Sequence, residues 1–462
     1  MAFEIPEDLM VSVSGVRGRV GQGLTPEVVA HFAAAFGAWL HERADRPRVV
    51  LARDSRVSGP MFRLAVLAGL QSVGCDVIDA GLVPTPTALF TIRHHGADGG
   101  IVVTASHNPV EWNALKFASA AGMFLDGDEA SAMRAYLSEK PIRRATWDTL
   151  GSVSTDDDAV DRHLAAVLAI RYLDLEALRN RRFRVVLDCA RGAGGVLLPR
   201  LLDALGCDVV GMDLEPDGRF SRTPEPVAEN LAGLEAKVRE TGADIGMATD
   251  PDADRLSLVS GEGRAIGEDL TLALAADLVL RHNPGPVVTN LSTSRVLQDV
   301  AEAAGATLYR SPVGEINVAR AMQQVRAVIG GEGNGGVILP DVHLTRDSAV
   351  AAALVLQALL ESGGTLVEFS HRHGPYVIVK DKLPATTSTD AALRILEEQL
   401  AAPESDRRDG LRLDWPADRA WLHLRASGTE PVFRIIAEAP TLEKARELVD
   451  GASAVLGGRS AG

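Results

Sequence analysis

The sequence has few cysteines, an acidic start and no long apolar run. Its three cysteines are widely spaced, which fits neither a disulfide framework nor a zinc-binding pattern and indicates a reducing compartment. The first eight residues, Met1 to Asp8, lack the basic residues of a signal peptide, and no apolar stretch is long enough to cross a membrane. We therefore expect a cytoplasmic protein without a membrane partner.

Positive charge is also scarce, because the net charge of the chain is −15. A nucleic-acid partner is unexpected, since phosphate backbones require a basic face. An anionic small molecule would need a local group of cations instead. Nearly all the cationic side chains of the protein are arginines. A lysine close to a motif is therefore less easily explained by chance.

The 462 residues and their 46% hydrophobic content indicate a folded protein of roughly three domains. Apolar strands alternate with helical patterns over most of the chain, which predicts mostly parallel sheets covered by helices. Strands are expected at 49–52, 77–80, 101–104, 185–188, 245–248 and 287–290, and a long apolar helix from Ser348 to Leu360. From about Pro375 the pattern changes to an α+β module, with a strand, a helix, two or three strands and a last helix.

The first chemical motif is Thr104-Ala105-Ser106-His107-Asn108-Pro109, directly after the apolar run 100–103. In layered α/β proteins chemistry takes place where buried strands end, so Ser106 is a nucleophile, a phosphate carrier or a turn residue. The G-x-S-x-G elbow is absent, and in an extended chain His107 would point away from the Ser106 hydroxyl. Nucleophilic hydrolysis is therefore disfavoured.

The second motif is Asp250-Pro251-Asp252-Ala253-Asp254-Arg255, in which three carboxylates follow a predicted strand. Oxygen ligands of this kind suit a hard cation such as Mg²⁺, although a solvated acidic turn is an equally good interpretation of the string alone. An EF-hand is excluded, since Arg255 and Gly261 stand where that loop needs glycine and glutamate. An anionic partner would require nearby cations, for which Arg255, Arg17 and Lys116 are candidates.

Two further segments are candidates for ligand binding. The turn from Arg425 to Arg434 offers hydroxyls, backbone N–H groups and two guanidinium groups to a phosphate, or is a simple hairpin with surface arginines. The loop 330–336 has five glycines around Glu332, whose carboxylate could accept bonds from neighbouring sugar hydroxyls, or it is a turn without a role. The weaker segment Arg53-Asp54 is expected to form a buried ion pair of the scaffold.

These four motifs, in this order, resemble the α-D-phosphohexomutase family over essentially the whole chain. The resemblance implies three similar α/β domains with mixed or parallel sheets and a C-terminal α+β domain around a central cleft. The expected boundaries are 1–154, 155–260, 261–374 and 375–462, one domain more than the length indicates. It also implies a Mg²⁺-dependent isomerase that interconverts hexose or hexosamine 1-phosphates and 6-phosphates through a phosphoserine and a 1,6-bisphosphate, as a monomer or homodimer.

The resemblance assigns a role to each candidate residue. Ser106 would carry the phosphoryl group and, with Asp250, Asp252 and Asp254, hold one Mg²⁺. Lys116 and Arg255 would offset charge on the transferring group, with Lys116 also moving the hydroxyl proton, beside Arg17 and His107. The sugar and its distal phosphate would be bound by Glu332, Asn334, Arg425, Ser427, Gly428, Thr429 and Arg434.

The chain departs from the family pattern at three places. Asn334 and Gly336 stand where members often carry serine and histidine, which leaves no histidine acid or base in the sugar loop. Glu315 follows Val313-Gly314 where a basic residue is common, and Ala114 replaces a usual glycine. These changes leave the choice among glucose, mannose and glucosamine open, and a non-catalytic sugar-phosphate-binding protein or a phosphatase are the alternatives.

Overall fold

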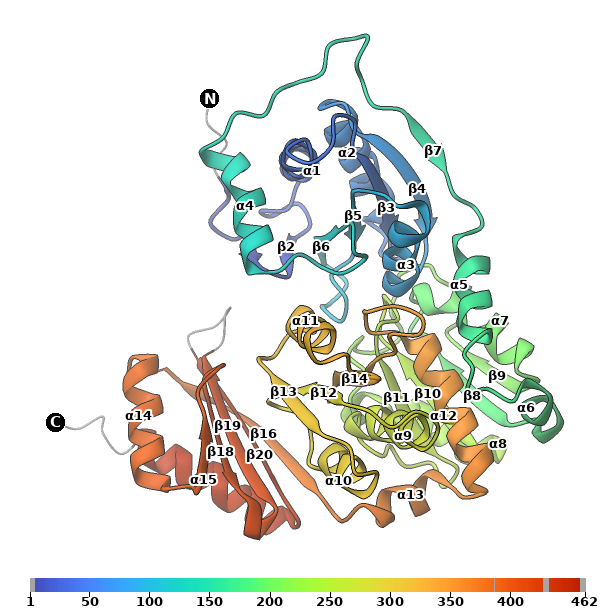
Figure 1. Ribbon diagram of the computed structural model, residues 1–462, viewed down its shortest axis with the longest axis vertical. Helices are drawn as coiled ribbons and strands as arrows, with labels where there is room; N and C mark the ends of the chain where they lie inside the picture. Colours follow the sequence, from blue (N-terminus) through green and yellow to red (C-terminus); the bar gives the residue numbers. More distant parts are fainter. Residues whose placement is uncertain (1–4, 386, 427–431, 458–462) are drawn as a thin grey trace. The chain divides into compact units, whose positions relative to one another are not determined.

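The computed structural model describes residues 5–385, 387–426 and 432–457. The chain forms two compact units: unit 1 comprises Met1–Thr271 and Asn334–Leu366, and unit 2 comprises Leu272–Gly333 and Val367–Gly462. The described residues form four sheets (Figure 1). There is thus one sheet more than the roughly three domains that the length predicts, and the C-terminal sheet has a hydrophobic core of its own.

The first sheet of unit 1 has the strand order β1-β2-β6-β5-β3-β4-β7. Strands β3, β4, β5 and β7 pair in parallel, whereas β1, β2 and β6 run antiparallel to their neighbours, so the sheet is mixed. The strands are β1 (Met10–Ser12), β2 (Gly15–Arg19), β3 (Arg48–Arg53), β4 (Asp76–Leu82), β5 (Gly99–Val103), β6 (Trp112–Ser119) and β7 (Val153–Thr155).

Helices cover both faces of this sheet because its central strands are apolar on both sides. Val49 and Leu51 of β3 belong to the core under α1 (Pro26–Leu40), α2 (Gly59–Gln71) and α4 (Gly127–Ser138). Val50 and Ala52 pack on the opposite face, under α3 (Thr85–His95). This alternation follows from the two-residue period of a strand. Helix α1 begins after Thr25, whose side chain accepts a hydrogen bond from the Val28 amide.

The second sheet of unit 1 has the order β11-β10-β8-β9, with β11 antiparallel to β10. Its strands are β8 (Arg184–Asp188), β9 (Asp208–Met212), β10 (Ile245–Thr249) and β11 (Leu256–Ser260), and its helices are α5 (Ala159–Leu168), α6 (Leu175–Arg181), α7 (Leu198–Ala204) and α8 (Ala232–Thr241). The predicted long apolar helix is α12 (Ser348–Ser362), which is buried through Leu359 and contacts α5, α6 and α7. The short strand β15 (Gly336–Ile338) precedes it.

Unit 2 begins with a parallel group of three strands, ordered β13-β12-β14. These strands are β12 (Val287–Asn290), β13 (Leu308–Ser311) and β14 (Ile329–Glu332), and the accompanying helices are α10 (Val296–Ala303) and α11 (Glu315–Val325). Helix α9 (Asp269–His282) begins in unit 1 and continues into unit 2.

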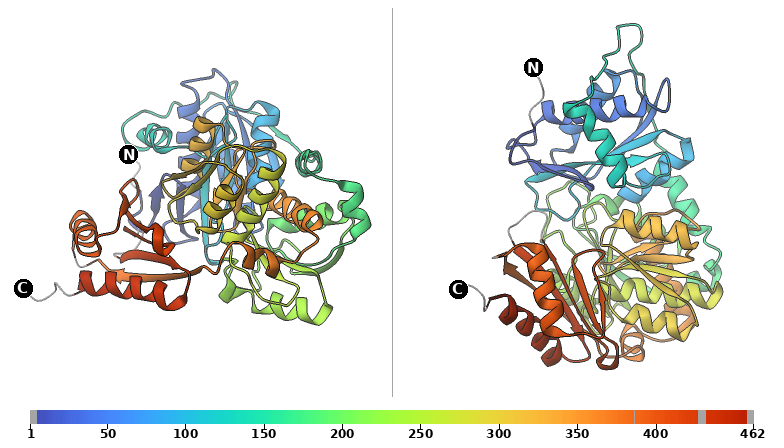
Figure 2. Two further views of the ribbon diagram at one scale, coloured as in Figure 1. Left: turned by 60° about the horizontal axis from the view of Figure 1, so that its bottom comes forward. Right: turned by 60° about the vertical axis from the view of Figure 1, so that its left-hand side comes forward.

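The C-terminal module has the antiparallel order β16-β20-β19-β18-β17 and two helices that pack together on one face (Figures 1 and 2). Its elements, after α13 (Leu366–Arg372), are β16 (Val377–Pro384), α14 (Thr389–Leu400), β17 (Glu404–Asp406), β18 (Leu411–Trp415), β19 (Ala420–Ala426), β20 (Val432–Ala439) and α15 (Leu442–Gly457). Four strands follow α14 rather than two or three, because β17 is short and polar and gives no apolar signal. The predicted α/β class with a C-terminal α+β module is confirmed.

Among the described residues, no single helix is long and apolar enough to span a membrane. Helices α12 and α13 reach that length and composition when they are taken together across the 82° bend between them.

Candidate active site

Ser106 lies in the loop between β5 and β6, at the end of a fully buried strand. Its backbone has φ 49°, a left-handed conformation that non-glycine residues rarely adopt. The Thr104 hydroxyl accepts a hydrogen bond from the Ser106 amide at 3.0 Å and donates one to Asp54 at 2.6 Å. The Ser106 hydroxyl donates to Oδ2 of Asp250 at 2.9 Å, so the serine loop and the acidic loop meet in the structure.

Arg56 fixes the backbone of the serine loop, residues 104–112, through hydrogen bonds. Its guanidinium group donates to four backbone carbonyls of the loop, those of residues 106, 108, 109 and 112, at 2.6–2.8 Å. Arg56 and its ion-pair partner Asp54 are both fully buried, and Nε of Arg56 lies 3.2 Å from Oδ2 of Asp54. The predicted Arg53–Asp54 ion pair is therefore wrong in its partner: Arg53 donates to the backbone carbonyl of Asp54, whereas the carboxylate binds Arg56.

His107 does not point away from the Ser106 hydroxyl as the extended-chain argument predicted. Its Nδ1 lies 3.4 Å from Oγ of Ser106, because the left-handed turn at Ser106 brings the two side chains to one side. Arg255 and burial together hold the pKa of His107 well below its ordinary value. A neutral imidazole therefore stands beside the candidate reacting oxygen.

The acidic loop connects β10 to β11, and its three aspartates are fully buried. Ala253, between two of them, has φ 56°, which turns the chain so that all three carboxylates face one point. Oδ1 of Asp252 and Oδ1 of Asp254 are buried without a hydrogen-bond partner. Buried carboxylate oxygens without donors are costly, and a hard divalent cation would satisfy them. The residues present therefore fit Mg²⁺.

Cations surround these carboxylates. The ammonium group of Lys116 lies 2.9 Å from Oδ2 of Asp252, which also accepts from the Thr85 hydroxyl at 2.8 Å. Nε of Arg255 is 3.7 Å from Asp254 and 4.0 Å from Asp250. The guanidinium group of Arg346 donates to Oδ2 of Asp254 at 2.5 Å. Three carboxylates thus face three cations inside unit 1.

The pKa directions follow from this arrangement. Burial and the neighbouring Asp254 and Asp252 raise the pKa of Asp250 well above its ordinary value. Burial also acts to raise the pKa of Asp252, but the attraction and hydrogen bond of Lys116, together with hydrogen bonds to Asp250 and Thr85, outweigh it and hold that pKa low. Burial lowers the pKa of Lys116, yet Asp252 and Asp254 more than offset this and raise it overall.

Arg17, on β2, also reaches this centre. Its guanidinium group donates to Oδ1 of Asn108 in the serine loop at 3.3 Å. Burial and the proximity of Arg255 lower its pKa, as expected for a cation in a group of cations. The structure therefore brings together Ser106, His107, Lys116, Arg17, Arg255 and the three aspartates.

Arg346, Arg56 and Thr85 are the residues that sequence reasoning missed or ranked as weak. Arg346 is separated from Asp254 by 92 residues. No local pattern could connect the two, since the pairing depends on how α12 packs. Arg56 lies within a charged string, Arg53-Asp54-Ser55-Arg56, where spacing alone does not distinguish the partners of Asp54.

The predicted sugar-binding glutamate lies in unit 2, at the end of β14, and is buried. Oε1 of Glu332 accepts hydrogen bonds from the Asn290 amide group at 2.8 Å and from the Gly314 backbone at 2.9 Å. Asn334 belongs to unit 1, where its Oδ1 accepts from the Gly336 amide at 3.2 Å.

The predicted phosphate clamp is described in part. Arg425 and Arg434 lie opposite each other on β19 and β20, whereas Ser427, Gly428 and Thr429 fall outside the described residues. Arg425 pairs with Asp409 at 2.9 Å, and Oδ2 of Asp409 also accepts from the Val313 amide at 2.9 Å. Since the next residue, Gly314, binds Glu332, the turn at 313–314 connects the sugar-loop carboxylate to the clamp arginine within unit 2.

Comparison with known families gives four consecutive matches. The phosphoglucomutase/phosphomannomutase α/β/α domains I, II and III match residues 9–142, 161–263 and 267–375, and the C-terminal domain of the same family matches 376–454.

Individual relatives agree with these matches. A phosphoglucomutase/phosphomannomutase of Thermococcus kodakarensis is 41% identical, covering 94% of this chain and 96% of its own. A probable phosphoglucosamine mutase of Methanopyrus kandleri is 37% identical, covering 95% of each. The crystal structure of a phosphoglucomutase/phosphomannomutase family protein from Burkholderia thailandensis matches with a TM-score of 0.85 at 29% identity, over 98% of this chain and 99% of that one.

Proposed function

The chain belongs to the phosphoglucomutase/phosphomannomutase family of isomerases, and we propose that it is a Mg²⁺-dependent mutase with a phosphoserine at Ser106. In this proposal it interconverts hexose or hexosamine 1-phosphates and 6-phosphates through a 1,6-bisphosphate. One observation carries the proposal: the Ser106 hydroxyl is hydrogen-bonded to Asp250 inside a buried centre of three carboxylates and three cations. A phosphoryl group on Oγ would enter a site already equipped with both signs of charge.

Asp250, Asp252, Asp254 and a phosphorylated Ser106 would hold the metal ion. A bound Mg²⁺ would supply neutralisation of charge on the phosphoryl oxygens. Mg²⁺ and a dianionic phosphoryl group carry equal and opposite charges. Their joint presence would therefore leave the net charge of the site unchanged. Lys116, Arg255 and Arg346 then remain to stabilise charge that develops during transfer.

Transfer breaks the bond between phosphorus and Oγ of Ser106 and forms a bond between phosphorus and a sugar hydroxyl oxygen. The sugar hydroxyl loses its proton and Oγ finally gains one, and the reverse reaction reloads the serine from the other end of the bisphosphate. We assign the proton at Oγ to His107, whose Nδ1 lies 3.4 Å from that oxygen: it accepts the proton when the serine is rephosphorylated and returns it when the phosphoryl group leaves. The attacking sugar hydroxyl lies in line on the other side of phosphorus, so its proton passes to solvent. Lys116 is held as an ammonium ion by Asp252, which favours charge compensation over proton transfer for this residue.

A mutase must bind its sugar in two orientations, since either phosphate reacts in turn. We propose that Glu332 binds sugar hydroxyls and that Arg425 and Arg434, with the hydroxyls at 427 and 429, bind the phosphate that is not reacting. The link through Asp409 supports a joint role, because the two groups are fixed to the same turn. A phosphatase would need no second phosphate site.

The relatives include both a phosphoglucomutase/phosphomannomutase and a probable phosphoglucosamine mutase, so glucose, mannose and glucosamine phosphates are the candidate substrates. The proposed partners are sugar phosphates in the cytoplasm, where the free thiols of all three cysteines are stable. Comparison of kcat/KM for the 1-phosphates of glucose, mannose and glucosamine, each with a bisphosphate primer, identifies the preferred substrate.

Intact mass and activity of one pair of variants test the function. Wild-type protein should contain a fraction heavier by one phosphoryl group and should isomerise a sugar phosphate. Ser106→Ala should lose both properties, whereas Ser154→Ala, at an exposed strand serine, should keep both. Equal mass and equal rate in wild type and Ser106→Ala would contradict the proposal. Release of phosphate faster than isomerisation would identify a phosphatase, and ligand stabilisation without turnover a binding protein.

A further inference from the structure

Gly336 lies against the stem of Arg346, at the position where family members often carry histidine. A Cβ atom on Gly336 would lie 2.2 Å from Cδ and 2.9 Å from Cγ of Arg346. The backbone of Gly336 is not in the left-handed region, so space rather than conformation requires glycine here. The arginine stem and a side chain at 336 exclude each other.

Arg346 cannot simply move aside, because it is fixed at its far end. It is 7% exposed, and its guanidinium group donates to Oδ2 of Asp254 at 2.5 Å. Oδ1 of the same carboxylate is buried without a hydrogen-bond partner. Arg346 thus occupies one oxygen of a proposed metal ligand, whereas the other has no hydrogen-bond donor and lies 3.7 Å from Nε of Arg255.

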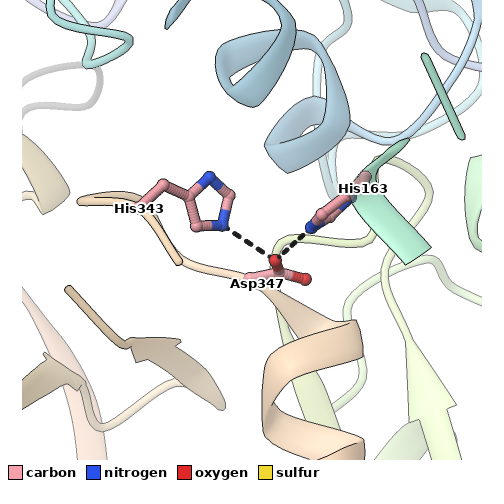
Figure 3. Close-up of side chains that lie close together, drawn as sticks. All are labelled: His163, His343 and Asp347. Atoms are coloured by element: carbon pink, nitrogen blue, oxygen red, sulfur yellow. Dashed lines mark hydrogen bonds and ion pairs between the residues drawn. The ribbon is translucent and has the colours of Figure 1, made fainter. Parts of the chain in front are cut away.

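The backbone that carries Arg346 is anchored by a buried cluster of His163, His343 and Asp347, shown in Figure 3. Oδ2 of Asp347 accepts from Nε2 of His163 at 2.7 Å and from Nε2 of His343 at 2.8 Å. Its Oδ1 accepts from the amides of residues 349 and 350, which caps α12. The residue next to Arg346 is therefore held by four hydrogen bonds.

The same cluster does not have the geometry of a metal site. Two ligands on one tetrahedral zinc ion lie about 3.3 Å apart, since each bond is about 2.0 Å long. The observed 2.7 and 2.8 Å are hydrogen-bond distances, and four N–H groups already satisfy the carboxylate of Asp347. On the other ring nitrogen, His163 is bonded to the Thr87 hydroxyl at 2.8 Å. The cluster is an anchor for the start of α12.

The start of α12 is also joined directly to the acidic loop. The hydroxyl of Ser348 donates to the backbone carbonyl of Ala253 at 2.7 Å, between the second and third aspartates. The Gly335 carbonyl accepts from the Leu256 amide at 2.9 Å, just after the same loop. Arg346 therefore lies between two segments that are both fixed to the loop it contacts.

We propose that Arg346 is a positioning residue that sets the orientation of Asp254 for the metal, and that Gly336 is its steric counterpart. This inference rests on the proposed function, because it concerns a ligand of the proposed Mg²⁺. The aliphatic stem of Arg346 occupies the space beside position 336. Its guanidinium group places a positive charge against Asp254 of the acidic loop. Glycine at 336 therefore leaves room for the stem of Arg346.

Two variants and their combination test the pairing. Gly336→Ala should lower the Tm by several degrees and reduce kcat, because the new Cβ displaces the arginine stem. Arg346→Ala should reduce kcat about 10- to 100-fold, as loss of a residue that orients a metal ligand does. In the Arg346→Ala background, Gly336→Ala should add little to either effect, since Cγ and Cδ are gone. Additive effects in the double variant would overturn the pairing.

Metal selectivity provides a readout that a merely structural role would not change. Mg²⁺ requires near-ideal octahedral geometry whereas Ca²⁺ tolerates variation, so a less restrained Asp254 should lower the ratio of Mg²⁺ to Ca²⁺ affinity about tenfold. Calorimetry on the full-length protein measures both affinities without turnover. Arg346→Lys should restore part of the ratio, and Arg63→Ala, which removes the partner of the buried Asp79 outside this centre, should leave it unchanged.

The outcomes separate this inference from the proposed function. A wild-type protein that binds neither cation, or that lacks phosphoserine and mutase activity, would refute the proposed function and with it this inference. A wild-type protein that binds Mg²⁺ and isomerises sugar phosphates, together with an Arg346→Ala variant of unchanged selectivity and kcat, would refute the positioning role alone.

Discussion

Replacing Arg56 by alanine should destabilise the serine loop more than any neighbouring change. Arg56 is fully buried, bonds four loop carbonyls and pairs with the buried carboxylate of Asp54. Removing one partner of a buried ion pair costs about 3–5 kcal/mol, because the remaining charge is left without compensation. The four carbonyls add to this cost unless water replaces their donor. We expect the loop to open at least about 4 kcal/mol more easily.

The pH dependence of this defect follows from Asp54. Burial already raises the pKa of this carboxyl, and attraction to Arg56 is the main effect that opposes the rise. Without Arg56 the pKa in the folded state rises further above its unfolded value. A group shifted in this direction stabilises the fold when it is protonated and loses that contribution as pH rises through the folded pKa. The defect of Arg56→Ala should therefore be smaller at about pH 5 than at about pH 8.

Amide hydrogen exchange across residues 99–119 measures the opening locally, which matters because a chain of two units need not unfold in one step. Arg53→Ala is the matched control: Arg53 is partly exposed and donates one bond to the Asp54 backbone, so it should cost under about 1 kcal/mol. Arg56→Lys should not rescue the loop, since one ammonium group cannot reach four carbonyls. A larger effect of Arg53→Ala than of Arg56→Ala would refute the reasoning.

Three further predictions concern the same centre. Phosphorylated protein should bind Mg²⁺ at least about tenfold more tightly than Ser106→Ala, because the phosphoryl group adds oxygen ligands and negative charge to a centre whose cations already offset the aspartates; equal affinities by calorimetry would contradict this reasoning. His107→Ala should lower kcat about 100-fold with little change in KM, whereas a loss confined to KM would assign His107 to binding. Asp347→Asn should lower both the Tm and the ratio of Mg²⁺ to Ca²⁺ affinity, while His94→Ala, at an exposed helix position, should change neither.

The sequence predicts the framework of unit 1 well, because its signals are local. Apolar strands of two-residue period, the cap at Thr25 and the run 348–360 each depend on neighbours within one or two turns of chain. The position of Ser106 at a strand end also follows from such signals. The approach of Ser106 to Asp250 spans 144 residues, and only the order of motifs in a known family indicated it in advance.

The errors arise where the backbone leaves its regular conformation. His107 is misplaced because the prediction assumed an extended chain, whereas Ser106 has φ 49°. The partner of Asp54 is misassigned for a related reason: the residues after β3 turn, which brings Arg56 and not the adjacent Arg53 to the carboxylate. In both cases the sequence identified the segment correctly, but one turn of the backbone determined which side chains are in contact.

The contact of Arg346 with Asp254 could not be predicted from the sequence. The glycine at 336, which leaves space for the stem of Arg346, is the one related feature that the sequence shows. The structure explains the glycine at 336, because a Cβ atom at this position would lie 2.2 Å from Cδ of Arg346. The stem of Arg346, ten residues later in the chain, fills the space that a side chain at 336 would need. A departure from a family pattern is therefore best interpreted together with the side chain that occupies the space concerned, because close packing leaves little room unfilled.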